Sequence, residues 1–239
     1  METRVEEIGE RIYRLCTLVD RPGGAFGFNQ FLVDADEPLL FHCGHRHLFP
    51  SVSAALAKVM PPSRLRWISF GHVEADECGS MNQWLAAAPQ ATVVHGPIGC
   101  RIDLTDMADR PPRSLDDDGV LDLGGRKVRM LCTPHVPHGW EAIALYEETT
   151  RTLFSGDLGT NLINDRLFAA EGLAEAALRL ENNAPVPPTA LTAKTAPTIR
   201  RLADLQPRTM AVMHGASAQG DCASVLHALA DGYQRLFEG

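Results

Sequence analysis

Residues 71–79 read Gly-His-Val-Glu-Ala-Asp-Glu-Cys-Gly and place four potential metal ligands within six positions: His72, Glu74, Asp76 and Glu77. Carboxylates this close together repel one another unless a cation neutralises them. The apolar run 65–70 predicts a buried strand before them, and residues 80–88 predict a helix after them, with Ser80 as its N-cap. The ligands are therefore expected on a loop at the carboxyl end of a strand, where α/β sheets place their sites. We interpret the segment as half of a two-metal site.

The composition of the chain sets the limits of this interpretation. It has 239 residues, a formal charge of −8 and 45% hydrophobic residues, which predicts a single domain over residues 1–239 with a core large enough to enclose a metal site. The acidic balance argues against nucleic acid as a partner, because nucleic-acid binders carry a basic face. No apolar run approaches the ~20 residues that a membrane helix needs, so no membrane partner is expected.

The cysteines and the N-terminus bear on the cellular location. The six cysteines are scattered and form no Cys-x-x-Cys pair, which is typical of reduced thiols in a cytoplasmic protein. The first residues are charged and contain no apolar core of a signal peptide, so none is expected.

Hydrophobic patterning predicts strands and helices in two successive blocks. The first block has expected strands at 12–19, 28–33, 39–41, 65–70 and 92–95, and helices at 49–60 and 80–88. The second has expected strands at 120–123, 127–132, 143–147, 152–155 and 209–213, and helices at 173–180, 195–205 and 223–237. Strands followed by helices, twice over, predict an α/β fold of the αββα sandwich type.

Three further donors stand directly after expected strands and beside glycine. They are His138 in the segment 133–141, Asp157 in 153–159 and His214 in 210–215. Glycine allows the backbone to turn tightly at such a place, so that a side chain can reach across the edge of the sheet. Donors that are distant in sequence are therefore expected to converge on one rim.

These motifs resemble the metallo-β-lactamase superfamily over essentially the whole chain. The hydrolases of that superfamily carry His-x-His-x-Asp-His in the first loop, whereas the flavodiiron branch carries His-x-Glu-x-Asp-His. The present chain has His72-x-Glu74-x-Asp76-Glu77 and is most similar to the diiron domain of flavodiiron proteins and their oxygen-binding relatives without a flavodoxin domain. The resemblance extends to His138 with an acidic residue three positions on, and to the later Asp and His ligands.

The resemblance implies a ligand set for two metal ions. One metal would take His72, Glu74 and His138, the other would take Asp76, Glu77 and His214, and Asp157 would bridge them. Glu77 departs from the family pattern, which has His at that position. With Glu77, four carboxylates offset two divalent cations, and such hard donor sets favour iron, with zinc or manganese as alternatives. The open alternative is that Glu77 faces solvent and the second metal site is weak or empty.

Two other histidine groups need an interpretation. His135 competes with His138 for the ligand role. The resemblance favours His138, because its distance to the following strand matches the corresponding segment of the family, and this leaves His135 to hydrogen-bond a ligand. The cluster His42, Cys43, His45 and His47 could hold a separate metal, but such clusters are more often loop residues. By the resemblance, His42 would lie under the metal site.

Two functions compete, and a third is weaker. The first is a diiron protein that binds or reduces dioxygen or nitric oxide. The sequence shows no FMN site and leaves no length for a flavodoxin domain, so reduction would need an external electron donor. The alternative is a metal-dependent hydrolase that uses a metal-bridging hydroxide on an ester, thioester, lactone or phosphodiester. The third is a metal-free interaction module, in which the carboxylate cluster would lack compensation. Dimerisation of the chain stays open.

Overall fold

The computed structural model describes residues 2–21 and 24–239. The strands of the first sheet are β1 (Thr3–Gly9), β2 (Ile12–Arg21), β3 (Gly24–Val33), β4 (Leu39–Phe41), β5 (Trp67–Ser69), β6 (Thr92–His95) and β7 (Arg113–Ser114). Those of the second are β8 (Val120–Asp122), β9 (Lys127–Cys132), β10 (Ile143–Glu147), β11 (Thr152–Phe154), β12 (Thr209–Ala211) and β13 (Ala218–Gln219). The sheet orders are β1-β2-β3-β4-β5-β6-β7 and β13-β12-β11-β10-β9-β8.

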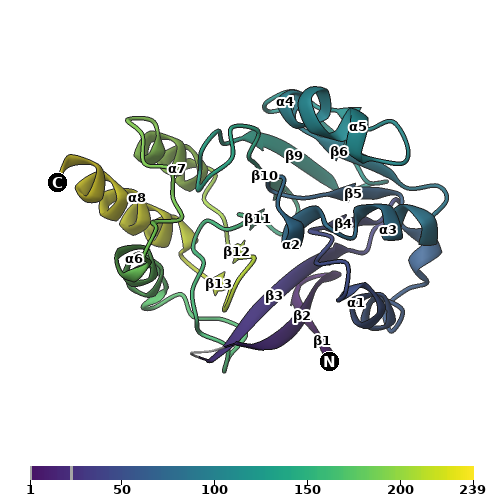
Figure 1. Ribbon diagram of the computed structural model, residues 1–239, viewed down its shortest axis with the longest axis horizontal. Helices are drawn as coiled ribbons and strands as arrows, with labels where there is room; N and C mark the ends of the chain where they lie inside the picture. Colours follow the sequence, from purple (N-terminus) through teal and green to yellow (C-terminus); the bar gives the residue numbers. More distant parts are fainter. Residues whose placement is uncertain (1, 22–23) are drawn as a thin grey trace.

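Helices cover the outer faces of both sheets (Figure 1). The helices are α1 (Phe49–Leu56), α2 (Ala75–Cys78), α3 (Met81–Ala87), α4 (Pro97–Gly99), α5 (Thr105–Met107), α6 (Leu173–Asn183), α7 (Thr195–Asp204) and α8 (Cys222–Glu238), with a 3-10 turn at Pro62–Arg64 and a π-helical turn at Cys100–Leu104. Helices α6, α7 and α8 lie on the outside of the second sheet, and α1 and α3 lie beside the first (Figure 1). The predicted α/β fold of αββα type is confirmed.

Alternation along the strands produces three apolar layers. In β3, Phe31 faces the layer between the two sheets, and its neighbour Leu32 faces the helices α1 and α3. Phe41 and Phe154 join Phe31 between the sheets. The ring centroid of Phe154 lies 5.5 Å from that of Phe41 and 5.7 Å from that of Phe31. Successive side chains of a strand point to opposite faces, so a strand buried on both sides carries an unbroken apolar run.

Parallel pairing brings the carboxyl ends of β4, β5 and β6 to one edge of the first sheet, and those of β11 and β12 to one edge of the second. The loops that follow these strands carry the expected donors. A parallel pair needs a crossover connection, which here is supplied by helical segments. The topology therefore collects residues from distant parts of the chain at neighbouring edges.

Several predicted elements differ from the structure. The helix expected at 49–60 ends at Leu56, and residues 75–78 of the ligand segment form a short helix where only a loop was expected. Ser80 occupies the expected N-cap position of α3, but its hydroxyl donates to the carbonyl of Cys43 at 2.6 Å and makes no capping bond to the helix. Strand β1 and the helical region 97–107 were not predicted. These short or charged segments gain their structure from the sheets they pack against, which local patterning does not reveal.

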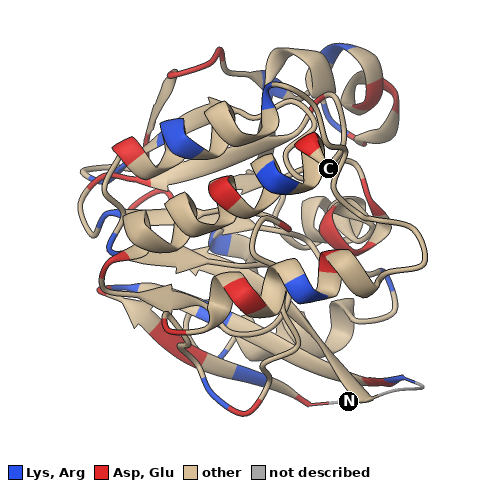
Figure 2. Ribbon diagram, turned by 90° about the vertical axis from the view of Figure 1, so that its left-hand side faces the viewer, with Lys and Arg blue, Asp and Glu red and all other residues tan. Residues whose placement is uncertain are grey.

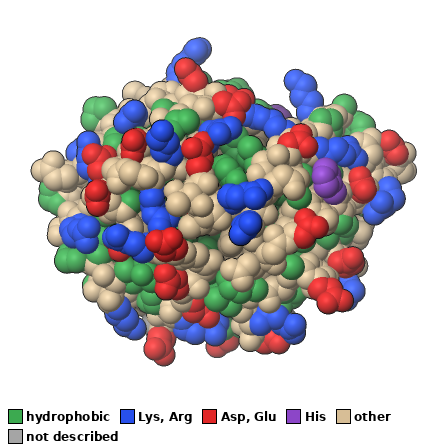
Figure 3. Space-filling model, turned by 180° about the vertical axis from the view of Figure 1, so that it is seen from behind, with side chains coloured by type: hydrophobic (Ala, Val, Ile, Leu, Met, Phe, Trp, Pro, Cys, Tyr) green, Lys and Arg blue, Asp and Glu red, His purple; other side chains and the backbone are tan. Residues whose placement is uncertain are grey.

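Acidic and basic residues alternate along the helices of the C-terminal face (Figure 2), and acidic and basic side chains are interspersed on the back of the molecule (Figure 3). Among the described residues, no helix combines the length and the hydrophobicity required to cross a bilayer.

Candidate metal centre

The loop after β5 carries the first two donors, and two buried carboxylates hold its backbone. The N–H of His72 donates to Glu77 at 2.7 Å, and the N–H of Val73 donates to Glu141 at 2.9 Å. Glu77 is fully buried and Glu141 is 7% exposed. Backbone donors that would otherwise be unpaired at the end of the strand are thereby satisfied. The positions of His72 and Glu74 are fixed as a consequence.

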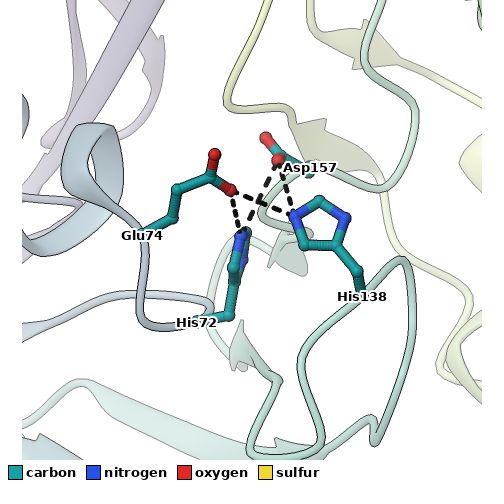
Figure 4. Close-up of side chains that lie close together, drawn as sticks. All are labelled: His72, Glu74, His138 and Asp157. Atoms are coloured by element: carbon teal, nitrogen blue, oxygen red, sulfur yellow. Dashed lines mark hydrogen bonds and ion pairs between the residues drawn. The ribbon is translucent and has the colours of Figure 1, made fainter. Parts of the chain in front are cut away.

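Four side chains converge beside this loop (Figure 4). The Oε2 atom of Glu74 lies 2.8 Å from Nε2 of His72 and 3.1 Å from Nε2 of His138. The Oδ2 atom of Asp157 lies 4.0 Å from the first of these nitrogens and 3.7 Å from the second. One potential ligand atom from each of the four residues lies within 4.8 Å of the others.

A second set of donors lies on the other side of Asp157. Its Oδ1 atom is 3.2 Å from Nε2 of His214, and Oδ2 of Asp76 is also 3.2 Å from that nitrogen. The Nδ1 atom of His214 lies 2.8 Å from the carbonyl of Gly27, which only accepts hydrogen bonds. Nδ1 therefore carries the proton, and Nε2 is left as the free donor atom of the neutral ring. Asp157 thus faces two sets of donors with its two oxygens.

Glu77 lies on the opposite side of His72 from the other donors. Its Oε1 atom is 3.3 Å from Nδ1 of His72 and 3.5 Å from Nε2 of His42, whereas Nε2 of His72 faces Glu74. Burial favours the neutral acid, but the rings of His42 and His72 lower the pKa of Glu77. Glu77 therefore does not face solvent, and its carboxylate orients His72. Its assignment as a ligand of the second metal stays a prediction.

The structure separates the two histidines that competed in the loop after β9. His138 points into the group of four, whereas His135 is exposed on the loop and has a left-handed backbone conformation (φ 62°). The Nδ1 atom of His138 is buried and has no hydrogen-bond partner among the described residues. Its Nε2 atom instead faces the carboxylates of Glu74 and Asp157, at 3.1 and 3.7 Å.

The charges at the centre stabilise one another. Burial lowers the pKa of His72, but Glu77 and Glu74 outweigh this effect and raise it to about 11. Burial likewise opposes the protonation of His214, and Asp157 raises its pKa to about 10. Burial raises the pKa of Asp157, yet His214 lowers it to about 2, and hydrogen bonds from His138 and His72 hold the pKa of Glu74 far below its ordinary range. In the metal-free protein, protons on the histidines offset the carboxylates.

This donor set fits divalent first-row metals. Imidazole nitrogens and carboxylate oxygens suit iron, manganese and zinc, and oxygen-rich sets favour the harder ions. The buried Oδ1 atom of Asp157 has no hydrogen-bond partner among the described residues, although it lies 3.2 Å from His214. A cation between the two donor sets would satisfy this oxygen. The residues present therefore fit a metal-binding site at this place.

A cavity of about 700 Å³ opens over the centre. Its floor includes Glu74, Asp76 and Asp157, and its wall is largely apolar. The apolar wall comes from β3 and from the region of α6 and α8: Phe26, Phe28, Leu180, Val186 and Tyr233. Sequence patterning gave no indication of this wall, because its residues look like ordinary core or loop positions. His45 also lines the cavity, and the sequence had associated it only with a separate cluster.

Residues 26–215 match the model of the family described as ODP family beta lactamase, and the chain belongs to that family. The matched region contains all the donors described above.

Curated relatives are similar over part of the chain. A putative diflavin flavoprotein A 1 of Thermosynechococcus vestitus is 27% identical over 148 residues, which is 60% of this chain and 26% of the relative. The flavo-diiron protein FprA2 of Clostridium acetobutylicum is 23% identical over 159 residues, which is 65% of this chain and 40% of the relative. The chain thus spans less than half of the length of these two relatives.

Solved structures share the fold at low sequence identity. A putative diflavin flavoprotein A 5 fragment (1–254) from Nostoc sp. superposes with a TM-score of 0.82 at 19% identity, covering 98% of this chain and 96% of that one. The rubredoxin oxygen:oxidoreductase of Desulfovibrio gigas gives a TM-score of 0.79 at 16% identity, covering 98% of this chain and 62% of that one.

Proposed function

We propose that this chain is a diiron domain that binds or reduces dioxygen or nitric oxide. The observation that carries the proposal is the position of Glu74, whose carboxylate oxygen lies 2.8 and 3.1 Å from the Nε2 atoms of His72 and His138. A carboxylate in this place makes the donor set harder than one with three histidines. Hard anionic donors suit iron and stabilise its higher oxidation state.

The ligand assignment follows from the two donor sets. His72, Glu74 and His138 would hold one metal, Asp76 and His214 would hold the other, and Asp157 would bridge them with its two oxygens. A pair of iron ions supplies the one-electron steps that dioxygen or nitric oxide chemistry requires. The residues of the chain hold these ions, orient the imidazoles through Glu77 and Gly27, and surround the open side with an apolar wall.

We infer that residues 1–239 act as one domain at this centre. The ligands come from loops of both sheets, since His72 follows β5, Asp157 follows β11 and His214 follows β12. The layer that contains Phe31 and Phe154 joins the same two sheets. Each donor set contains residues from both sheets, so separation of the sheets would break up both sets.

Repeated reduction of dioxygen needs a supply of electrons from outside the metal pair. The similar structure from Desulfovibrio gigas is named rubredoxin oxygen:oxidoreductase, and this name contains both rubredoxin and oxygen. We infer by analogy a redox partner of this kind for the present chain. Electron transfer from reduced rubredoxin to the iron-loaded chain under anaerobic conditions, followed in the visible spectrum, tests this partner.

A second candidate function is supported by the cavity. Its volume of about 700 Å³ and its apolar wall suit an organic molecule. A diatomic gas does not require a cavity of this size. A metal-dependent hydrolase of esters, thioesters, lactones or phosphodiesters would use such a cavity to bind its substrate. The extra negative charge of Glu74 lowers the Lewis acidity of the metals and disfavours this function.

One experiment separates the two functions. The chain is loaded anaerobically with Fe(II), its metal content is measured, and air or nitric oxide is admitted while the absorption spectrum is recorded. We expect two iron ions per chain and a new absorption band. Hydrolysis of an ester and phosphodiester panel by a zinc-loaded sample, without any spectral response of the iron-loaded sample to either gas, would overturn the proposal.

A further inference from the structure

The second donor set is short of ligands compared with the first. Within residues 2–21 and 24–239, this set consists of His214, with Asp76 and the shared Asp157 each 3.2 Å from its Nε2 atom. Protein sites for transition metals commonly use four or more donors, of which solvent supplies some. Glu77, which the family pattern places at this metal, is turned toward Nδ1 of His72. A position at the second metal is thus left without its expected side chain.

His45 is the candidate for this position. It lies in the loop between β4 and α1 and lines the same cavity as Asp76, Asp157 and His214. Its ring centroid is 5.0 Å from that of Phe28, and the ring of His214 packs against the same phenyl group at 5.2 Å. The two imidazoles therefore share one aromatic wall.

The loop that carries His45 is tied to the segment that carries Asp76 and Glu77. The N–H of Cys43 donates to the carbonyl of Glu77 at 2.6 Å, and the N–H of Ser80 donates to the carbonyl of Gly44 at 2.9 Å. Gly44 has a φ of +84°, and a Cβ atom there would lie 3.2 Å from the side chain of Gln30. Backbone hydrogen bonds and this tight turn fix the start of the loop close to the metal centre.

The His45 ring is available for coordination. Within the described residues its side chain makes ring contacts with Phe28 and His47 but no hydrogen bond or ion pair. An imidazole without another polar partner is free to bind a metal through a ring nitrogen.

We propose that His45 is a nitrogen ligand of the second metal and replaces the side chain that Glu77 withdraws into the protein interior. The inference rests on the proposed dinuclear function and adds to it a ligand from a different loop. In this arrangement Glu77, at the expected ligand position, orients His72. His45, from the neighbouring loop, would supply the missing donor to the second metal.

The test is the metal stoichiometry of matched variants. The intact chain, His45→Ala and His47→Ala are loaded anaerobically with Fe(II), passed through a desalting column and analysed for iron. His47 is the control because it is exposed and its ring stacks on that of His45 at 5.2 Å. We expect two iron ions in the intact chain and in His47→Ala, and about one in His45→Ala, since loss of a metal ligand weakens binding strongly.

A second readout distinguishes loss of a ligand from loss of the fold. His45→Gly is loaded in the presence and absence of free imidazole, and its circular dichroism is compared with that of the intact chain. Recovery of the second iron by imidazole supports coordination by His45. Two iron ions of unchanged affinity in both His45 variants would overturn the inference and leave the dinuclear function intact. Fewer than two iron ions in the intact chain would instead overturn the dinuclear function.

Discussion

The buried carboxylate of Glu77 accepts a hydrogen bond from the backbone N–H of His72 at 2.7 Å, and its other oxygen lies 3.3 Å from Nδ1 of the same residue. Glu77 therefore fixes both the backbone and the ring of a metal ligand. A carboxylate that holds the second nitrogen of a coordinating histidine sets its tautomer and raises its basicity.

Replacement of Glu77 by Gln should weaken binding of the metal that His72 holds. The amide retains the size of the side chain but loses its negative charge, and we expect affinity to fall about 10- to 100-fold. Competition with a metal chelator measures the change, and Glu175→Gln on the exposed side of α6 is the control. A different result would make Glu77 a ligand of the second metal. In that case Glu77→Gln would lose the second metal completely, and its affinity for the metal held by His72 and His138 would be unchanged.

Substitution of Asp157 by Ala should remove both metals together. Its two oxygens face different histidines, with Oδ1 3.2 Å from His214 and Oδ2 3.7 Å from His138. Elemental analysis after anaerobic loading measures the loss, and the exposed Asp165→Ala serves as the control. A variant that keeps one metal at full occupancy would contradict a bridging role for Asp157.

His138→Ala and His135→Ala should differ in metal content. His138 lies 3.1 Å from the Glu74 carboxylate, whereas His135 is exposed. We expect the first variant to lose affinity mainly at one metal, and the second to bind both metals as the intact chain does. Titration with Fe(II) or Co(II) measures both affinities, and the reverse result would exchange the two assignments.

Metal binding should release protons at neutral pH. Glu77 and Glu74 raise the pKa of His72 to about 11 and Asp157 raises that of His214 to about 10, so these two rings are protonated at pH 7 in the metal-free protein. Metals bind the neutral ring, so metal loading should release a proton from each of these two rings, and apparent affinity should fall as pH falls. Calorimetry in two buffers of different ionisation enthalpy measures the release. No buffer dependence would show that the rings are already neutral.

His95 should make the metal-free protein less stable at mildly acidic pH. It is fully buried, neither ring nitrogen has a hydrogen-bond partner among the described residues, and burial lowers its pKa from 6.5 to about 4. Between these values the unfolded chain binds a proton that the native state excludes, so stability falls as pH falls. The full loss is about 3 kcal/mol.

Urea unfolding at pH 7 and pH 4 checks this prediction. His95→Leu should lose less stability over that interval than the intact chain, by about 3 kcal/mol. The exposed His227→Ala should leave the pH dependence unchanged. An equal loss in His95→Leu and the intact chain would show that His95 does not control the acid sensitivity.

The sequence by itself determined the class of fold and most of the donors. Apolar runs of strand length identified β5, β10 and β12, because a strand buried on both faces needs a continuous apolar stretch. Donors placed after such strands beside glycine were expected to converge, and His72, His138 and Asp157 do lie together. Local patterning was sufficient here because the position of a donor after a strand follows from chain direction alone.

Only the tertiary structure decided the direction in which each donor points. Asp76 and Glu77 are adjacent in sequence, yet Asp76 approaches His214 while Glu77 approaches Nδ1 of His72, because the turn of α2 directs them to different sides. The proximity of His45 to the centre likewise depends on β3 and on the loop after β4, which pack together across a long sequence separation. Side-chain direction and long-range packing follow from contacts between segments, so they cannot be predicted from the spacing of residues along the chain.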